Sequence, residues 1–519
     1  MNRSDSIHLL QKRTEPFDIA VIGGGSSGFG VALEALSRGL SVALFDKNDF
    51  GKGTSSRSTK LLHGGVRYLA QGDIRLVYEA LEQRGNILKA APHLTSVKRF
   101  VIPIYSRLER LKYTAGLKVY DLMSGRLRIG RSRYTTREDT LKRLPGIEDK
   151  NLIGGVIYHD GQFDDIRLLL SVARTCADAG AAVLNYAEVT GLMKTREGKV
   201  AGVRVRDRLS GEEFSVKAKM TVNATGVFAD SILQMDVPGM AKSIRPSQGV
   251  HLVLDADFLG GTDALMIPET SDGRVLFAVP WEGKLIVGTT DTLRDIPEYE
   301  PGALTEEVDF ILETAGAYLR RKPLRSDVRS VFTGLRPLAA PKRGDAQTKE
   351  ISRSHRVIIA ESNLVSIVGG KWTTFRKMGK DTVEAYAKLT GKKLPAIVNP
   401  FDKLHGYAPP SEGPFSRYGT DAEEIKSLMK ERKTYAEKLS PGHPFVKAEI
   451  IRAVRKEMAV TVEDVLSRRM RLLILDARAA RAAAPETARI MAEELGKDPA
   501  WIEAEIAAFN KIADIHILT

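Results

Sequence analysis

The amino-acid sequence predicts an α/β fold with three parts: a Rossmann-like domain, an antiparallel-sheet domain and a C-terminal helical domain. Three observations support this prediction. An apolar segment near the N-terminus runs directly into a glycine-rich turn, residues 243–292 alternate apolar and polar side chains between short turns, and residues 421–519 have helical periodicity almost throughout. These patterns are typical of buried parallel strands, half-exposed antiparallel strands and amphipathic helices, respectively.

The glycine-rich turn predicts a dinucleotide site. Residues 17–22 are mostly apolar and predict a buried strand, and the following Gly23, Gly25 and Gly28 have G-x-G-x-x-G spacing. Gly23 permits the tight turn, Gly25 lets a diphosphate approach the backbone, and Gly28 lets the next helix press on the sheet. That helix, predicted at 27–38, directs its free amide groups and positive dipole end at the diphosphate.

An acidic residue completes the dinucleotide pattern. A second predicted strand, at 41–45, leads into Asp46. About 20 residues beyond the glycines, a carboxylate can accept both hydroxyls of an adenosine ribose. A tight strand-to-helix turn without a ligand is the alternative, but it leaves this acid unexplained.

Composition narrows the class of protein. The 519 residues are enough for two or three domains, and 43% hydrophobic with 28% charged residues is ordinary for a soluble protein. Cys176 is the one cysteine, so an intramolecular disulfide and a cysteine-based metal cluster are excluded, no metal is expected, and a reducing compartment is favoured. The N-terminus lacks a signal-peptide pattern, and no window reaches the roughly 18 apolar residues of a membrane span.

The net charge of +13 is unusual. It fits nucleic acid, an anionic membrane surface or a phosphorylated substrate. No nucleic-acid motif accompanies it, so nucleic acid is not expected as a partner. Residues 107–143 are especially basic and have amphipathic character, which leaves two interpretations open: contact with acidic lipid, or a solvated face over an ordinary core helix.

Residues 51–69 form a second candidate ligand-binding segment. Glycines and small hydroxylated side chains precede Leu61 there, and such backbone and hydroxyl donors suit a bound phosphate group. His63, Arg67 and Tyr68 lie close to these glycines in the sequence. A solvated loop is the alternative.

The predicted domains are assembled from separated pieces. A strand ending at 223 runs into a small-residue turn, a later apolar strand is broken by paired glycines at 369–370, prolines at 395–414 indicate a linker, and an arginine- and alanine-rich helix is predicted at 468–484. The predicted boundaries are 15–95, 155–240 and 355–395 for the Rossmann-like domain, 96–154 and 241–354 for the antiparallel-sheet domain, and 415–519 for the helical domain.

With these pieces placed, the chain resembles the flavin-dependent glycerol-3-phosphate dehydrogenases, a branch of the glycine and D-amino-acid oxidase-like flavoproteins. The resemblance covers nearly the whole length. The motifs that carry it are VIGGG at 21–25, TSSRSTKLLHGGVRYL at 54–69, VNATG at 222–226, VGTTD at 287–291, GLRPL at 334–338 and GGKWTTFR at 369–376. The second and the last of these are specific to this branch.

The resemblance implies FAD as the cofactor, and the sequence holds one complete dinucleotide fingerprint. Two departures are small: Asp46 replaces the glutamate that the family often has, and Trp372 replaces a smaller apolar residue. The implied cofactor-binding residues are Gly23, Gly25, Gly28, Asp46, Lys47, Thr54, Ser55, Ser58, Lys60, Leu61, His63, Gly64, Gly65, Ala224, Thr225, Gly226, Gly370, Lys371, Trp372 and Thr373.

The resemblance also implies the reaction, in which glycerol 3-phosphate is oxidised to dihydroxyacetone phosphate by hydride transfer to FAD. Candidates to hold the substrate phosphate are Arg67, Tyr68, Arg336 and Arg353. His251 is the first choice for the base that takes the hydroxyl proton, Arg336 stabilises developing charge, and Lys371 lies where flavin and substrate oxygen meet. His251 as a structural histidine is an equal alternative.

The fate of the electrons has two interpretations. Quinone-linked members of the family sit on the inner face of the bacterial membrane, which predicts a cytoplasmic, peripherally attached dehydrogenase that reduces membrane quinone; an oxidase that uses oxygen is the alternative. An amino-acid oxidase or deaminase on the same fold is a further rival, as is a non-catalytic flavin-containing interaction protein. The oligomeric state stays open, with a homodimer among the alternatives.

Overall fold

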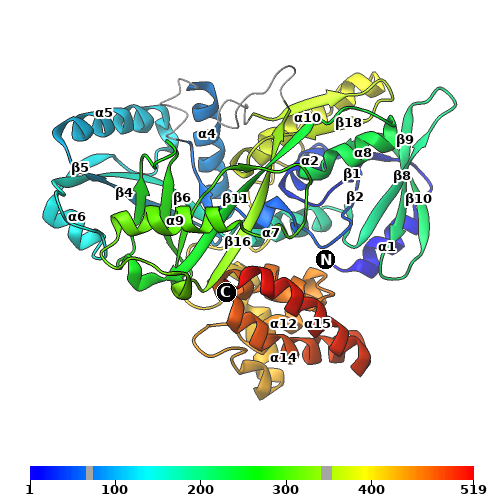
Figure 1. Ribbon diagram of the computed structural model, residues 1–519. Coiled ribbons are helices and arrows are strands. Elements are labelled where there is room, and N and C mark those ends of the chain that lie inside the picture. Colours follow the sequence, from blue (N-terminus) through cyan, green and yellow to red (C-terminus); the bar gives the residue numbers. More distant parts are fainter. Residues whose placement is uncertain (66–73, 341–353, 519) are drawn as a thin grey trace.

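The computed structural model describes residues 1–65, 74–340 and 354–518. In Figure 1 two sheets lie side by side with their helices, and the C-terminal helices form a separate layer beneath them. The predicted α/β fold class, with a Rossmann-like sheet, an antiparallel sheet and C-terminal helices, is confirmed. None of the helices in the described ranges is both long and apolar enough to cross a membrane.

The first sheet has a parallel centre. β1 pairs in parallel with β10 on one side and β2 on the other, so that Ile19 lies beside Met220 and Val42. In spatial order the strands are β17 Arg356–Ile359, β18 Val365–Val368, β10 Glu213–Asn223, β1 Phe17–Ile22, β2 Val42–Phe45 and β7 Ala182–Leu184, with β8 Ala187–Lys194 and β9 Val200–Asp207 continuing from β10. The edge strand β17 runs antiparallel to β18.

Both faces of this sheet are buried. Side chains alternate along each strand, so successive residues pack on opposite faces. On β1, Ile19 and Val21 pack with one set of helices, whereas Ala20 and Ile22 pack toward β8 and β9. The first set is α2 Ser26–Ser37, α7 Asp165–Asp178 and α10 Phe375–Thr390, and the second face also receives α1 Arg3–Lys12 and α8 Ala229–Asp236. This double burial explains why β1 is apolar throughout from Ile19 to Ile22.

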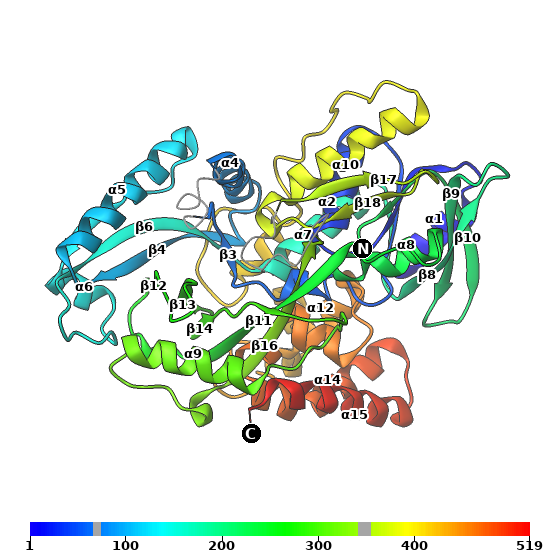
Figure 2. The same ribbon diagram turned by 45° about the horizontal axis from the view of Figure 1, so that its top comes forward.

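The second sheet is mostly antiparallel. In spatial order its strands are β15 Thr292–Leu293, β11 Ile244–Asp255, β14 Lys284–Gly288, β13 Leu276–Trp281, β12 Ala264–Ile267, β4 Thr95–Ile104, β6 Gly154–Phe163 and β3 Leu61–Leu62, with β16 Ser330–Ala339 on β11 and β5 Arg133–Thr136 on β6. The helices around it are α4 Ile74–Ala90, α5 Arg107–Met123, α6 Arg137–Arg143 and α9 Thr305–Tyr318. Figure 2 shows α5 along the outer part of this sheet, with α4 beside it and nearer the centre of the molecule.

The domain boundaries stay a prediction, and two stretches differ from it. β3 and most of β6 were predicted within the Rossmann-like domain, yet both pair in the second sheet. Strand partners depend on contacts far apart in sequence, which local patterns do not report.

The C-terminal part is helical, as predicted, but one expected helix is broken. The helices are α11 Ala422–Glu431, α12 Lys447–Glu457, α13 Leu472–Leu475, α14 Ala477–Leu495 and α15 Pro499–His516, with a π-helical turn at Asp464–Arg469. The prediction of a continuous helix over 468–484 is wrong, because Arg471 adopts left-handed backbone angles, with φ +68°, and the Asp476 side chain caps a new helix by accepting from the Ala479 N–H. Arginine and alanine both favour helix, so composition conceals the break.

Candidate active site

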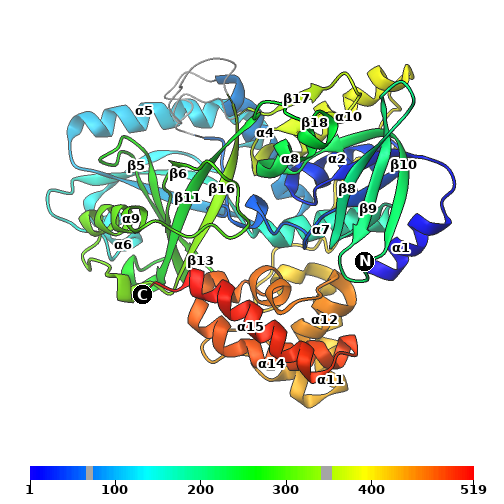
Figure 3. The same ribbon diagram turned by 45° about the vertical axis from the view of Figure 1, so that its right-hand side comes forward.

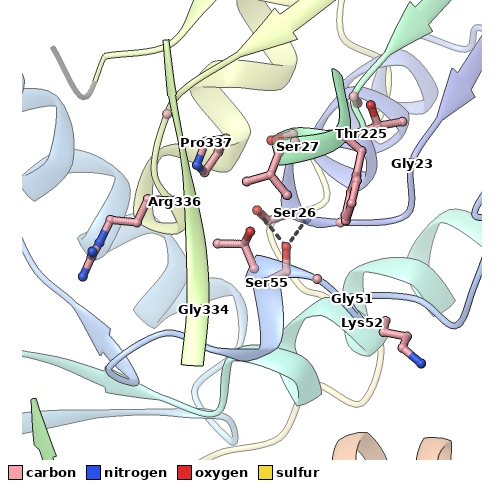
Figure 4. A pocket seen from close by; sticks show the side chains of 18 of the residues that line it. Gly23, Ser26, Ser27, Gly51, Lys52, Ser55, Thr225, Gly334, Arg336 and Pro337 are labelled. Atoms are coloured by element: carbon pink, nitrogen blue, oxygen red, sulfur yellow. Dashed lines mark hydrogen bonds between the residues drawn. The ribbon is translucent and has the colours of Figure 1, made fainter. Parts of the chain in front are cut away.

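A cavity of about 440 Å³ lies where the carboxyl ends of the parallel strands meet the second sheet. β1, β2 and β10 lead into its wall from one side, and β11 and β16 line it from the other. In open α/β sheets, ligands bind outside the carboxyl ends of the strands. Figure 4 shows Ser26, Ser55 and Thr225 together in this cavity, while Arg336 extends from β16 in the opposite direction.

The turn after β1 is packed so closely that two positions require glycine. Gly23 has φ +109°, and a Cβ there would lie 2.6 Å from the Ala224 carbonyl oxygen. A Cβ on Gly28 would lie 1.8 Å from the Gly23 carbonyl oxygen, so this glycine serves helix packing and does not itself line the cavity. Gly25 precedes α2 and does line it. The first turn of α2 therefore presents its positive end to the cavity, which suits a diphosphate.

Asp46 lies on the cavity wall directly after β2. Its Oδ2 accepts from the Gly24 N–H at 2.7 Å and its Oδ1 from the Asn48 N–H at 2.8 Å. Burial raises the pKa of Asp46 to about 7, against the effect of these two hydrogen bonds. The neighbouring Lys47 is exposed and pairs with Glu188 at 2.9 Å. Backbone donors thus orient the carboxylate beside the turn, where the prediction requires a ribose-binding acid.

The segment 54–61 crosses between the two sheets. Thr54 Oγ1 donates to the Leu335 carbonyl at 2.6 Å, and Ser55 Oγ accepts from the Ser26 N–H at 2.9 Å. The Trp372 indole N–H donates to the Ser55 carbonyl at 2.9 Å. These bonds tie the segment to β16, to α2 and to the turn after β18, so each wall of the cavity holds it.

Most of the predicted cofactor residues lie together on this cavity. Those that line it are Gly23, Gly25, Asp46, Lys47, Thr54, Ser55, Ser58, Leu61, His63, Ala224, Thr225, Gly226, Gly370, Lys371, Trp372 and Thr373. The sequence motifs at 23–28, 54–63, 224–226 and 370–373 therefore converge from four separate stretches of chain.

Lys60, Gly64 and Gly65 were also predicted to bind the cofactor, but they do not line the cavity. The Lys60 side chain is fully buried, and its ammonium donates to Asp165 Oδ2 at 2.7 Å and to the carbonyls of Ser56 and Ser58 at 3.0 and 3.1 Å. The Gly64 N–H donates to the Tyr120 hydroxyl at 2.9 Å. Some residues of the motif therefore line the cavity and others are directed into the interior, a distinction that its composition does not reveal.

His251 lies on β11 and is almost completely buried, with 3% of its surface exposed. Its Nε2 is 2.9 Å from Thr59 Oγ1, and its ring stacks on Phe332 with a centroid distance of 4.7 Å. Burial, followed by the positive charges of Lys60 and Arg336, holds the pKa of His251 well below the ordinary value. These effects favour the neutral imidazole, which has a lone pair for a proton, and they disfavour the protonated form.

Arg336 and Lys371 bring positive charge to the same cavity from β16 and from the turn after β18. The Arg336 guanidinium donates to the Thr290 carbonyl at 3.0 Å and to Thr289 Oγ1 at 3.2 Å, and it lies 3.4 Å from Asp291 Oδ1. Lys371 follows two glycines with positive φ. Arg336 is thus held from several sides, which fixes the plane of its guanidinium at the cavity wall.

Three predicted substrate residues, Arg67, Tyr68 and Arg353, lie outside the described residues. Conversely, the structure places residues at the cavity that the sequence did not single out: Arg57, Glu188, Val189, Phe228 and Tyr299. Phe228 and Tyr299 stack with ring centroids 4.2 Å apart. Arg57 stood within the predicted segment but was not chosen, whereas Tyr299 belongs to no motif and carried no signal.

Comparison with known proteins agrees with this geometry. The family model described as "FAD dependent oxidoreductase" matches residues 18–376, and that described as "C-terminal domain of alpha-glycerophosphate oxidase" matches residues 365–502. The chain belongs to the FAD-dependent oxidoreductases.

Individual relatives narrow this class. The chain is 39% identical to the mitochondrial glycerol-3-phosphate dehydrogenase of Bos taurus, over 97% of this chain and 74% of that protein, and 39% identical to the enzyme of the same name from Homo sapiens, over 94% and 72%. The solved structure of the glycerol-3-phosphate dehydrogenase from Bacillus halodurans, complexed with FAD, superimposes with a TM-score of 0.81 at 29% identity and covers 99% of this chain and 98% of that chain. Within its class, the chain is thus one of the glycerol-3-phosphate dehydrogenases.

Proposed function

We propose that this protein oxidises sn-glycerol 3-phosphate to dihydroxyacetone phosphate, with FAD as hydride acceptor. The observation that carries the proposal is the composition of one cavity: the glycine turn, Asp46 and Lys371 come from the first sheet, and His251 and Arg336 come from the second. A dinucleotide and a small phosphorylated alcohol both find matching residues there.

The described residues fit FAD. The turn after β1, whose Gly23 and Gly25 line the cavity, suits the diphosphate together with the N-terminus of α2. Asp46 suits the adenosine ribose, and the paired rings of Phe228 and Tyr299 offer an apolar wall. When bound, FAD supplies the two-electron acceptor for the hydride that leaves C2 of the substrate.

Positive charge in the cavity suits the substrate phosphate. Guanidinium groups bind phosphate oxygens through paired hydrogen bonds, and Arg336 presents such a group on a rigid strand. Lys371 adds a second cation to the same cavity, from the turn after β18. Arg67, Tyr68 and Arg353 stay predicted partners of the same phosphate.

For the proton, we favour His251 as the base. Oxidation breaks the C2–H bond, whose electron pair leaves with the hydride, and it also breaks the O–H bond, whose proton needs an acceptor. We place that proton on His251 Nε2, the nitrogen that Thr59 orients at 2.9 Å. Arg336 then stabilises the negative charge that develops on the substrate oxygen.

Anaerobic reduction of the flavin tests the proposal. The purified protein is loaded with FAD and mixed, without oxygen, with sn-glycerol 3-phosphate, glycerol or amino acids in turn. We expect bleaching of the oxidised flavin band with glycerol 3-phosphate alone. Bleaching by an amino acid instead would favour the amino-acid oxidase alternative, and no bleaching at all would remove the proposed reaction.

We also propose that the protein attaches peripherally to an anionic membrane surface, on the cytoplasmic side, and passes electrons to quinone. The support comes from α5. Leu108, Leu111, Val119 and Leu122 are 76%, 69%, 49% and 80% exposed, and their spacing places them on one face of the helix. The buried Leu117 and Tyr120 lie on the opposite face.

The side chains around these exposed apolar residues, which we call the outward stripe of α5, suit a lipid surface. Arg107, Arg110, Lys112 and Lys118 are exposed on the same helix. On the adjacent α4, Ile74 and Tyr78 are 62% and 59% exposed. A solvated face over a core helix would not explain large apolar side chains turned outward, whereas an amphipathic helix lying on acidic lipid would bury them and pair its cations with headgroups.

Vesicles and acceptors test these two statements separately. We expect the protein to sediment with anionic vesicles at low salt and to be released at high salt. A protein that stayed in solution at low salt would contradict the membrane proposal. In the second assay, turnover with a water-soluble quinone analogue is compared with oxygen uptake, and rapid oxygen reduction with no quinone reduction would favour an oxidase.

A further inference from the structure

Buried arginines of the C-terminal helices reach into the part of the chain that forms the cofactor cavity. Figure 3 shows these helices packed directly beneath α7. Arg468 and Arg469 both donate to Asp49 Oδ2 at 2.6 Å, three residues after Asp46. Arg471 donates to Ser56, within the segment 54–61 that crosses between the two sheets.

Arg471 makes two bonds across this boundary with one nitrogen. Its side chain is 1% exposed, and its Nη2 donates to the Ser56 carbonyl at 3.1 Å and to Asp165 Oδ1 at 2.9 Å. Its Nη1 donates within its own segment, to the Ser467 carbonyl at 3.3 Å. The left-handed backbone at Arg471 breaks the helix at the position from which this side chain extends.

The other carboxylate oxygen of Asp165 binds residues 58 and 60 of the same segment. Its Oδ2 accepts from the Lys60 ammonium at 2.7 Å, from Ser58 Oγ at 2.7 Å and from the Ser58 N–H at 3.0 Å. Lys60 in turn donates to the carbonyls of Ser56 and Ser58. Residues 56–60 therefore curve around the fully buried Asp165 carboxylate, which pairs with the Lys60 and Arg471 cations.

This bend positions groups at the cavity. Thr59 lies between Ser58 and Lys60, and its hydroxyl contacts His251. The Lys60 ammonium lies 5.1 Å from the centroid of the Phe332 ring, on which His251 stacks. Ser58 and Thr59 themselves line the cavity. The buried cluster is thus linked to His251, Ser58 and Thr59, all of which line the cavity.

We infer that Arg471, acting through Asp165 and Lys60, is a positioning residue that holds the Thr54–Leu61 segment in its cofactor-binding shape, so the C-terminal helices are a working part of the site. The inference deepens the proposed function, and it rests on that function in taking the cavity to bind FAD. Arg471 touches neither cavity nor ligand; it acts on the segment that does.

The test compares Arg471→Met with a matched control, Arg452→Met. Arg452 is equally buried in α12 and pairs with Asp421, Glu424 and Glu457, none of which belongs to the cavity. The readout is the dissociation constant of FAD, measured by fluorescence as the flavin-free protein is titrated. We expect Arg471→Met to weaken FAD binding by roughly tenfold or more, because the bonds that the charged guanidinium donates to Ser56 and Asp165 are lost. Arg452→Met should lower the thermal midpoint and leave the FAD affinity within about twofold.

Arg471→Lys keeps the inference testable if the methionine variant does not fold. Lysine keeps the charge, but its shorter side chain has one nitrogen, which cannot replace Nη2 at Ser56 and Asp165 and Nη1 at Ser467 together. We expect a folded protein that binds FAD several-fold more weakly and shows altered visible circular dichroism of the bound flavin. FAD affinity and flavin dichroism equal to wild type in both Arg471 variants, with only the thermal midpoint lowered, would overturn the inference.

These readouts are independent of the reaction. If wild-type protein bound FAD and glycerol 3-phosphate failed to reduce it, the proposed function would fail while the comparison of Arg471 with Arg452 stood. If wild-type protein bound no FAD, both would fail together.

Discussion

At the scale of single residues, Arg336 has the clearest expected effect. Its guanidinium donates to Thr289 and Thr290, and it is one of the residues that line the cavity. We expect Arg336→Ala to lower kcat/KM for glycerol 3-phosphate by about 10²–10³, since a charge-assisted contact to phosphate or to the developing oxyanion is lost. Steady-state kinetics check this. Arg329→Ala, at an exposed ion pair just before β16, is the control and should have little effect; unchanged kinetics in Arg336→Ala would remove Arg336 from the site.

His251 makes a second residue-scale prediction, on stability and pH. Its native pKa is lowered, so the folded protein leaves the ring neutral where an unfolded histidine, with a pKa of about 6.5, takes up a proton. Stability is therefore lost as pH falls below about 6.5. Between about pH 7.5 and about pH 5.5 we expect wild type to lose about 1.4 kcal/mol of unfolding free energy relative to His251→Asn, measured by urea denaturation. Parallel pH profiles for the two proteins would show that folding does not lower the pKa of His251.

At the scale of elements, the β1–α2 turn depends on the contact between Gly28 and the Gly23 carbonyl. A Cβ at Gly28 would lie 1.8 Å from that oxygen, so Gly28→Ala must move α2 away from the sheet. We expect the variant to purify without FAD, which its absorbance spectrum reports. Gly116→Ala in α5 is the control, because a Cβ there meets nothing within 4 Å. Full FAD occupancy in Gly28→Ala would mean that this turn does not hold the diphosphate.

The outward stripe of α5 makes the second prediction at this scale. We expect the triple variant Leu108→Ser, Leu111→Ser and Leu122→Ser to bind anionic vesicles at least roughly tenfold more weakly, because about 0.8 kcal/mol accompanies each CH₂ buried in lipid. Turnover with a soluble acceptor should not change. The control replaces Ile397 and Val398, which are 51% and 73% exposed far along the chain from α5, by serine. Equal vesicle binding by the triple variant and the control would place the membrane contact elsewhere.

At the scale of the whole molecule, buried ion pairs join the C-terminal helices to the rest. Asp49 is fully buried between Arg468 and Arg469, and their positive charges hold its pKa below the ordinary value although burial opposes this. We expect Asp49→Asn to destabilise the protein by about 3–5 kcal/mol, since it leaves buried charge uncompensated. Calorimetry should also show the C-terminal helices unfolding separately. Asp514→Asn, at an exposed pair with Arg481, should cost at most about 1 kcal/mol. Similar losses in both variants would contradict this account.

Much of the cavity was predictable because its residues belong to local motifs. Gly23, Gly25 and Asp46 were identified by spacing alone, since a strand, a tight turn and a helix dictate where glycine and acid must stand. Lys60 does not line the cavity although its neighbours Thr59 and Leu61 do, and the composition of the segment does not show which side chains turn inward. Tyr299 was missed because nothing near it in sequence relates it to Phe228, on which it stacks. The break at Arg471 was hidden within a composition that favours helix.

The sequence by itself determined the α/β class, the dinucleotide turn and the kinds of side chain that the chemistry requires, because these depend on periodicity and spacing within one stretch of chain. Only the tertiary structure decided which stretches share a cavity, that Lys60 and Asp165 are buried beneath it, that α5 turns leucines outward, and that Arg471 reaches the cofactor segment. Those facts depend on contacts between residues hundreds of positions apart, such as Arg471 and Ser56. Such contacts depend on packing and charge in the folded state, so local sequence patterns do not predict them.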